Sequence, residues 1–407
     1  MKFINFLRQS GQSYLGNFKG FTREIWILTF ITFINRAGTM VLPFMSKYLK
    51  EDLHFSYSQI GTVMVFFGLG SMLGSWLGGK FTDKIGFYKV MVFSLFTSGL
   101  SFFILKDIST FYGFCFGIFG VMTIADMFRP AMFVSIGAYA KPENRTRALT
   151  LVRLAINLGF AAGPALGGLI IMQLGYKSLF LIDGLTCILA ILIFTILVKE
   201  KKKPKDLTAE PVAPRSRVIR DRPFWVFLIT CVITGILFFQ LFTTLPLYQK
   251  EQFNLTEFQT GLLMTLNGFL VFFFEMPIVA LVEKKHINKA KMVALGCFGM
   301  AISVGLLLLN FWAGILIFVM VIFSFAEMFA FPFSNAFALS RAPKGQEGRY
   351  MAVFTMSYSL AHILSGEIGM NMVQVYGYQA NWVFMMSLGF VGTILGVWVL
   401  NTTRKES

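Results

Sequence analysis

The sequence predicts an all-α integral membrane protein in which twelve transmembrane helices form two pseudo-symmetric six-helix bundles. The first observation is composition: 56% of the 407 residues are hydrophobic and only 14% are charged, unlike an average soluble protein. The second is a succession of apolar stretches of about 20 residues, the length that crosses a bilayer. The third is an internal repeat, because Ala125-Asp126-Met127-Phe128 returns as Ala326-Glu327-Met328-Phe329.

The repeat has an offset of about two hundred residues, so each half holds six predicted spans. The first half contains 24–47, 57–80, 88–106, 109–138, 147–173 and 177–198. The second contains 223–249, 256–282, 290–310, 312–340, 348–375 and 380–400. This period is too long for a solenoid and suits a duplicated bundle around a central cavity. We therefore expect an N-terminal bundle over 1–198, a charged cytoplasmic linker over 199–222 and a C-terminal bundle over 223–407.

Basic residues predict the orientation, because they gather before the first span and after every second one. The positive-inside rule then places both termini in the cytoplasm and the chain in the inner membrane as a multi-pass protein. The same residues explain most of the net charge of +16, so we do not expect nucleic-acid binding. The expected partners are the lipid bilayer, protons and a small-molecule substrate, and we expect a monomer.

Enzymatic chemistry is not expected. The sequence has no phosphate-binding loop ending in Lys-Ser/Thr and no His-Glu-x-x-His metal motif. Its four cysteines stand apart within predicted helices, which indicates neither a metal site nor disulfides. We expect no cofactor, with a proton gradient as the energy source.

Ionisable side chains inside the spans are the functional candidates, because charge at membrane depth is costly unless it is paired or hydrated. Those of the first half are mainly cationic and those of the second mainly anionic. Glu327 lies among apolar and aromatic residues, which disfavour an ionised carboxyl and would let it load and release a proton. The candidates for proton coupling are Asp126, Glu327, Glu275, Glu367 and His362.

Each candidate also has a purely structural interpretation. Glu327 could be a permanently protonated hydrogen-bond partner, Glu275 could act as a gate, and His362 could only donate or accept a hydrogen bond. Asp126 and Arg129, three residues apart on one helix face, could partly neutralise each other. A cavity of aromatic and methionine side chains with a few charges suits bulky cations. The candidates for substrate binding are Arg36, Asn35, Arg129, Arg153, Asn157, Phe239, Gln240, Tyr248, Asn267 and Met328.

The link between the second and third spans reads Gly79-Lys80-Phe81-Thr82-Asp83-Lys84-Ile85-Gly86-Phe87-Tyr88-Lys89. Its glycines permit a tight turn between two helices. This segment resembles the signature loop of the major facilitator superfamily. The resemblance implies that Asp83, with Gly79, Lys84, Gly86 and Lys89, latches the two halves on the cytoplasmic side. The second half keeps Glu283-Lys284 but has His286 in place of the glycine.

The fifth span contains a run of small residues around Pro164, with Gly159, Gly163 and Gly167. Small residues let helices approach closely, and the proline bends the helix. This run resembles the drug/proton antiporter branch of the same superfamily, as do Asn35-Arg36 and Asp126 with Arg129-Pro130. In that branch, the resemblance implies, an acidic residue on the tenth helix, here Glu327, couples protons to cationic substrates.

These observations predict a proton-coupled secondary transporter that exports lipophilic or cationic compounds by alternating access. The alternative is proton-coupled uptake of small peptides or other zwitterions, since cationic residues of one half face anionic residues of the other. The Glu-x-x-Glu-Arg signature of proton-dependent peptide transporters is absent, because Phe33-Ile34-Asn35-Arg36 stands in its place.

Overall fold

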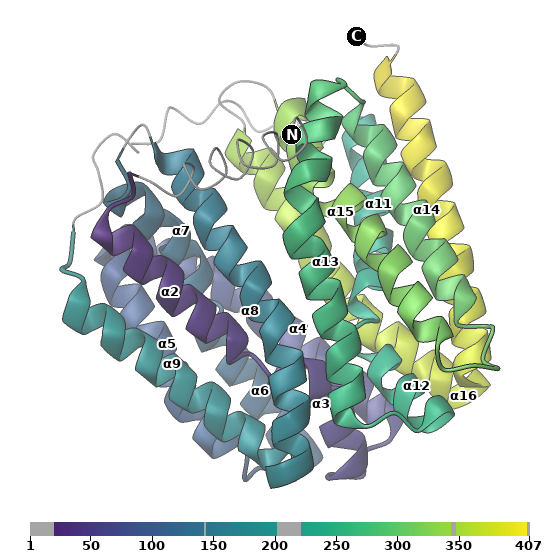
Figure 1. Cartoon of the computed structure of the whole chain (residues 1–407), viewed down its shortest axis with the longest axis horizontal. Coiled ribbons are helices and arrows are strands. Elements are labelled where there is room, and N and C mark those ends of the chain that lie inside the picture. Colours follow the sequence, from purple (N-terminus) through teal and green to yellow (C-terminus); the bar gives the residue numbers. More distant parts are fainter. Residues whose placement is uncertain (1–19, 142–143, 202–220, 343–346, 405–407) are drawn as a thin grey trace, which may run out of the picture.

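The computed structural model describes residues 20–141, 144–201, 221–342 and 347–404, and within these ranges it contains helices and no strands (Figure 1). The first bundle comprises α2 (Arg23–Ala37), α3 (Val41–Glu51), α4 (Tyr57–Ile85), α5 (Phe87–Leu105), α6 (Phe111–Ala125), α7 (Phe128–Tyr139), α8 (Arg145–Leu174) and α9 (Lys177–Leu197). The second comprises α11 (Arg222–Phe239), α12 (Thr244–Phe253), α13 (Glu257–Lys284), α14 (Lys289–Leu306), α15 (Ile315–Arg341) and α16 (Glu347–Arg404). The predicted fold class is confirmed. Most of the predicted linker, 202–220, lies outside the described residues.

The last helix crosses the membrane twice. Eleven described segments are long and apolar enough to span, and the last, Tyr350–Arg404, has 55 residues. A straight helix of that length would measure about 80 Å, far more than a bilayer of about 30 Å. Gly377 interrupts it with φ 81° and ψ 175°, so α16 folds back and supplies the eleventh and twelfth passes. The predicted gap over 375–380 was therefore too wide, because one glycine with positive φ makes the whole turn.

The duplication is visible in the backbone. Positive φ angles recur at equivalent turns of the two halves, in the pairs His54 and Asn254, Gly86 and His286, and Gly175 and Gly377. The second helix of each half begins with a capping box, Ser56 with Gln59 and Thr256 with Gln259. Such boxes satisfy two otherwise unpaired helix N–H groups. The two halves thus share turns and caps even where their side chains differ.

Three predicted spans are interrupted, which corrects the expectation of continuous helices over 24–47, 109–138 and 223–249. The breaks lie between α2 and α3, between α6 and α7, and between α11 and α12. Irregular backbone at membrane depth persists only where protein or a cavity satisfies its polar groups. Residues at all three breaks line a central cavity. Side chains hydrogen-bond the backbone there: Asp183 at the first break, Ser94 at the second and Thr243 at the third.

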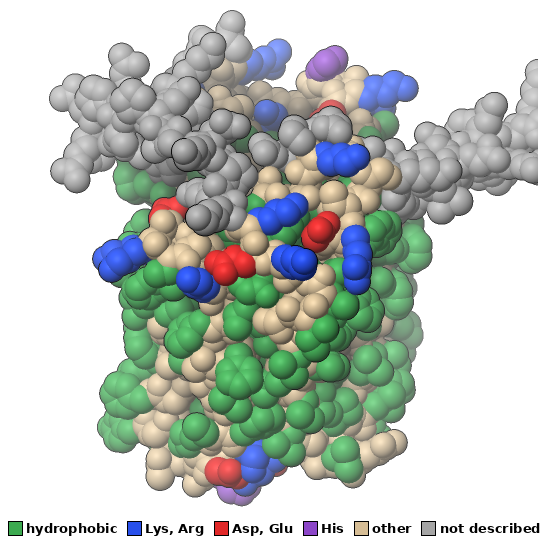
Figure 2. Space-filling view, turned by 90° about the vertical axis from the view of Figure 1, so that its left-hand side faces the viewer, with side chains coloured by type: hydrophobic (Ala, Val, Ile, Leu, Met, Phe, Trp, Pro, Cys, Tyr) green, Lys and Arg blue, Asp and Glu red, His purple; other side chains and the backbone are tan. Residues whose placement is uncertain are grey.

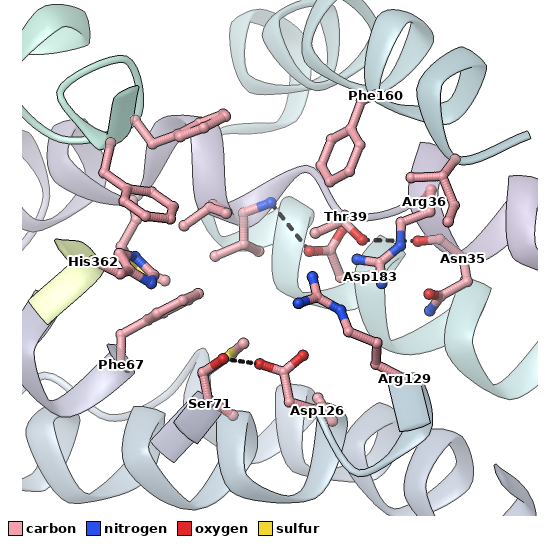
Figure 3. Close-up of a pocket in the computed structure, with 18 of the residues that line it drawn as sticks. Asn35, Arg36, Thr39, Phe67, Ser71, Asp126, Arg129, Phe160, Asp183 and His362 are labelled. Atoms are coloured by element: carbon pink, nitrogen blue, oxygen red, sulfur yellow. Dashed lines mark hydrogen bonds between the residues drawn. The ribbon is translucent and has the colours of Figure 1, made fainter. Parts of the chain in front are cut away.

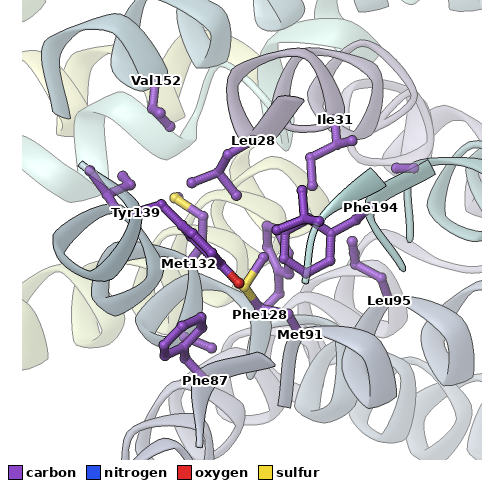
Figure 4. Packing of buried hydrophobic residues seen from close by; sticks show 14 of the residues in the cluster. Leu28, Ile31, Phe87, Met91, Leu95, Phe128, Met132, Tyr139, Val152 and Phe194 are labelled. Atoms are coloured by element: carbon purple, nitrogen blue, oxygen red, sulfur yellow. The ribbon is translucent and has the colours of Figure 1, made fainter. Parts of the chain in front are cut away.

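Buried apolar side chains fill the inside of each bundle. In the first bundle Leu28 of α2, Met91 of α5, Met132 of α7 and Phe194 of α9 pack in one cluster (Figure 4). The outside is also apolar: in Figure 2 hydrophobic side chains cover a broad middle band, and charged residues gather at its two ends. This distribution matches a lipid-facing surface between two aqueous edges.

The molecule has two ends, a terminal side and a distal side, each defined by its residues. The terminal side is the end with Arg23, Arg222 and Arg404, where both described termini lie. The distal side is the end with Glu51 and Tyr57, where α3 and α4 meet. In Figure 1 the two bundles lie closest at the distal side and separate toward the terminal side.

Candidate functional site: a cavity between the two bundles

A cavity of about 450 Å³ lies between the bundles and is lined by residues of both. This volume lies within the range of about 300–1,000 Å³ typical of small-molecule sites. Most of the lining is apolar or aromatic, with a few polar groups. Of the residues predicted from the sequence, it brings together Asn35, Arg36, Asp126, Arg129, Asn157, Pro164, Phe239, Asn267, Glu327 and His362.

Glu327 of α15 lies on the second-half wall. Its Oε2 accepts a hydrogen bond of 2.9 Å from Asn267 Nδ2 of α13, and the same amide donates to Ser324 Oγ at 2.9 Å. No cation lies within 4.0 Å of Glu327 in the described part of the chain. The carboxyl is therefore positioned by a neutral amide and faces the cavity without a fixed countercharge.

His362 of α16 lies between two aromatic rings at the junction of the bundles. Its ring stacks on Phe239 with a centroid distance of 4.2 Å and meets the edge of Phe67 at 4.9 Å. Phe67 belongs to α4 of the first bundle, so this group joins the two halves (Figure 3). It gives the cavity a flat, apolar surface on which an aromatic ring can stack.

Asp126 follows the last residue of α6 and accepts a hydrogen bond from Ser71 Oγ of α4. The sequence suggested that Asp126 and Arg129 partly neutralise each other on one helix face. They form no ion pair within 4.0 Å. The helix breaks at Asp126 and Met127, so the spacing of a continuous helix does not apply.

Asp183 of α9 is a cavity residue that the sequence reasoning missed. It is 3% exposed, and its two oxygens accept the backbone N–H groups of Met40 at 3.0 Å and Val41 at 3.1 Å. These are the N–H groups freed by the break between α2 and α3. Asp183 is the one acidic residue within the predicted span 177–198. Like Asp126 and Glu327, it is an ionisable side chain inside an apolar span, and this feature could have identified it.

Arg36 lies just before that break. Its guanidinium carbon is 5.7 Å from the centre of the Phe160 ring, a cation–π distance. Beside it, Asn35 Nδ2 contacts Cys187 Sγ at 3.4 Å. Figure 3 shows Arg36 and Arg129 reaching toward the same part of the cavity from α2 and α7.

Other candidates lie outside the cavity lining. Arg153 of α8 forms an ion pair with Glu275 of α13, which joins the two halves. Glu367 accepts a 2.8 Å hydrogen bond from Asn371, one turn further along α16. The remaining three are buried between helices: Gln240 donates to Ser365, Tyr248 donates to the Leu307 carbonyl, and Met328 is 0% exposed. Their expected place on the lining is corrected, because their polar atoms or apolar chains serve packing within the second bundle.

The motif residues lie where helices turn or touch. Gly86 has φ 93° and separates α4 from α5, as the tight-turn prediction requires, and Asp83 is exposed in the last turn of α4, on the terminal side. Gly79, Lys84 and Lys89 flank the same turn. In α8, Gly159 and Gly163 face α2, where an added Cβ would lie 2.9 Å from the Ala37 nitrogen and 3.0 Å from the Ala37 oxygen, and Gly167 faces Met40 and Phe44.

Polar contacts join the halves on the distal side. Lys47 of α3 is 0% exposed, and its Nζ lies 3.5 Å from Glu257 Oε1 and 3.2 Å from Thr260 Oγ1 of α13. Tyr176 Oη lies 3.2 Å from the same Glu257 oxygen. Two further contacts across the halves are Tyr57 to Glu251 at 2.5 Å and the Ser58 N–H to Gln374 at 2.6 Å.

A sequence model of the Major Facilitator Superfamily matches residues 25–366. The chain is 21% identical to a Na(+), Li(+), K(+)/H(+) antiporter of Planococcus maritimus, over 92% of this chain and 95% of that one. It is 25% identical to quinolone resistance protein NorA of Staphylococcus aureus over 62% of this chain and 66% of that one. Among solved structures, a POT family transporter in complex with 5-aminolevulinic acid has a TM-score of 0.79 at 16% identity, covering 95% of this chain and 97% of that chain. The nucleoside transporter NupG has a TM-score of 0.78 at 14% identity, covering 93% and 99%.

Proposed function

Because the chain belongs to the major facilitator superfamily, a family of membrane transporters, we propose that it is a proton-coupled antiporter that exports lipophilic cationic compounds. The observation that carries this proposal is the place of Glu327. Its carboxyl faces a cavity shared by both halves and has a neutral amide, not a cation, as its neighbour. Such a carboxyl can bind either a proton or a cationic group of the substrate, but not both at once.

The substrate class follows from the rest of the lining and from the relatives. Phe67, Phe239 and His362 provide an aromatic surface beside the carboxyl. Two of the relatives are described by their names as a cation/proton antiporter and as a quinolone resistance protein. The first name supports exchange of a cation for a proton, and the second supports an aromatic substrate. The carboxyl and the aromatic rings of this wall fit a substrate that combines the two features.

Alternating access supplies the transport step. In the structure the halves are joined on the distal side by the contacts of Lys47 and Glu257. We propose that this is the state open toward the cytoplasm, with both termini on that side of the inner membrane. Separation of these contacts, and closure at the Asp83 turn, would then expose Glu327 to the opposite side, where it exchanges substrate for a proton.

The test uses purified protein in vesicles that contain a pH-sensitive dye. An imposed proton gradient should drive movement of an aromatic cation such as ethidium, and ethidium should in turn drive proton flux. Glu327→Gln should abolish both fluxes. Asp107→Asn, which alters a carboxyl whose side chain is 66% exposed on the distal side, is the matched control and should transport normally. Full proton-driven transport by Glu327→Gln would refute the assignment.

A further inference from the structure

The two arginines of the cavity have hydrogen-bond donors that the described chain does not use. Among the described residues neither Arg36 nor Arg129 belongs to an ion pair within 4.0 Å, and Nε of Arg36 is buried without a partner there. A guanidinium carries five N–H donors. A buried donor such as Arg36 Nε is nearly always satisfied, whereas the side chain of Arg129 is exposed within the cavity. Arg153, by contrast, has its charge balanced within the protein, because it forms an ion pair with Glu275.

The acidic groups of the same wall are already engaged. Both oxygens of Asp183 accept backbone N–H groups, and Asp126 accepts a hydrogen bond from Ser71. Arg36 and Arg129 both line the cavity and reach toward the same part of it, so two like charges lie near each other there (Figure 3). Repulsion between like charges is strong where water is scarce. An anion between the two guanidinium groups would relieve it and would accept their free N–H donors.

The remaining walls define what else such a ligand must carry. Phe160 lies beside Arg36, and the rings of Phe67 and His362 also line the cavity (Figure 3). Phe239, which stacks on His362, belongs to the same lining. The second-half wall presents Glu327. A ligand that satisfies all three regions has an aromatic body, a carboxylate and an amine.

We propose that the preferred substrates are aromatic zwitterions, and that Arg36 and Arg129 form the subsite for their carboxylate. This inference rests on the proposed transport function and adds an acidic group to the cationic substrate. Arginine suits this subsite because its planar fork can bind a carboxylate through two parallel hydrogen bonds.

Two fluorescent probes test the subsite directly. Nε-dansyl-lysine carries a dansyl ring, an amine and a carboxylate, and dansylcadaverine is the same molecule without the carboxylate. Binding is measured by dansyl fluorescence on purified protein in lipid nanodiscs, without a proton gradient. A hydrogen bond to a charged group is worth about tenfold or more in affinity, so dansyl-lysine should bind at least about tenfold more tightly than dansylcadaverine.

Variants separate the subsite from general effects on folding. Arg36→Gln and Arg129→Gln should each weaken dansyl-lysine binding about tenfold, while dansylcadaverine binding changes less than about twofold and so reports an intact cavity. Arg36→Lys should recover only part of the loss, because lysine keeps the charge but not the fork. Arg23→Gln removes an exposed arginine of the terminal side and should leave both affinities unchanged.

Equal affinity of the wild-type protein for the two probes, including no binding of either, would overturn the proposal. So would an equal loss of both probes in the arginine variants. The proposed function fails separately: discrimination between the probes without proton flux in the vesicle assay would keep the carboxylate subsite and remove the proton coupling.

Discussion

The two halves share a backbone plan but differ in their buried chemistry. Equivalent turns at His54 and Asn254 both have positive φ, and the helices that follow them begin with the same kind of cap. Yet the cavity lining of the first half carries Arg36 and Arg129 together with Asp126 and Asp183, whereas that of the second half carries Glu327 and no arginine or lysine among the described residues. The comparison indicates that turns and caps preserve the frame, while substitutions along the inner helix faces give each half its own role.

The distal contacts follow the same pattern. Lys47 of α3 corresponds, at the offset of two hundred, to Leu247 of α12. Both side chains are buried, at 0% and 1% exposure, but only Lys47 brings a charge to the boundary between the halves. A single substitution at position 47 can therefore remove the charge that distinguishes the first half from the second at this boundary.

The largest expected effect on stability comes from Lys47→Leu, which gives position 47 the residue found at the equivalent position 247. This change leaves Glu257, whose side chain is 12% exposed, with Lys250 as its remaining cation at 3.5 Å. The free energy of unfolding, measured in mixed micelles, should fall by about 3 kcal/mol, the lower end for breaking a buried ion pair. The double variant Lys47→Leu with Glu257→Leu should recover most of the loss.

The exposed pair of Lys106 and Asp107 provides the matched control, since these side chains are 27% and 66% exposed. Lys106→Leu should change the free energy of unfolding by no more than about 1 kcal/mol, as is usual for surface pairs. Equal effects of Lys47→Leu and Lys106→Leu would mean that the distal contact does not hold the halves together.

The next effect compares two equivalent glycines, Gly68 and Gly268. A Cβ at 268 would lie 2.5 Å from the Cα of Ala161 in the other half, whereas a Cβ at 68 would lie 2.7 Å from Cγ1 of Ile363. Backbone cannot yield as a side chain can, so Gly268→Ala should destabilise the protein by about 1–3 kcal/mol. Gly68→Ala should cost less. Thermal unfolding of the two variants decides the order, and a larger loss of stability for Gly68→Ala would contradict the closer backbone contact at Gly268.

The last comparison concerns the equivalent turns at Gly86 and His286, where the change at His286 should have the smallest effect of all. Gly86 has φ 93° and ψ 150°, a region that costs a residue with a side chain about 1–3 kcal/mol. Gly86→Ala should therefore lower the free energy of unfolding by that amount. His286 has φ 49°, and His286→Gly should change stability by less than about 1 kcal/mol, because relief of strain is offset by the freer unfolded chain.

The sequence was sufficient to predict the approximate number of membrane passes, the duplication of the two halves and many of the residues that line the cavity. Apolar stretches of membrane-spanning length and an internal repeat are properties of the sequence itself, so they can be recognised without the structure. The breaks near Arg36 and Asp126 could not be found, because they depend on contacts between distant helices, such as Asp183 with Met40 and Val41. Gln240 was misplaced for the same reason: its partner, Ser365, lies on a helix far along the chain.

The contact between Lys47 and Glu257 was also beyond the sequence. Each residue lies near the end of a predicted span, where charges are ordinary, and nothing local indicates that Lys47 would be buried between the halves. Small residues let α8 and α13 approach closely, as at Gly261 against Ala165, and Glu257 at the start of α13 then lies at the boundary where Lys47 of α3 reaches it. Pairing of this kind needs the assembled bundles.

The most direct test of the account is the number of protons released when a cationic ligand binds. Dansylcadaverine is titrated into weakly buffered protein in nanodiscs while a pH indicator is followed. If proton and amine compete for one carboxyl, the wild-type protein should release up to about one proton per ligand, and Glu327→Gln should release none while remaining folded. Equal proton release by the two proteins would contradict the central claim.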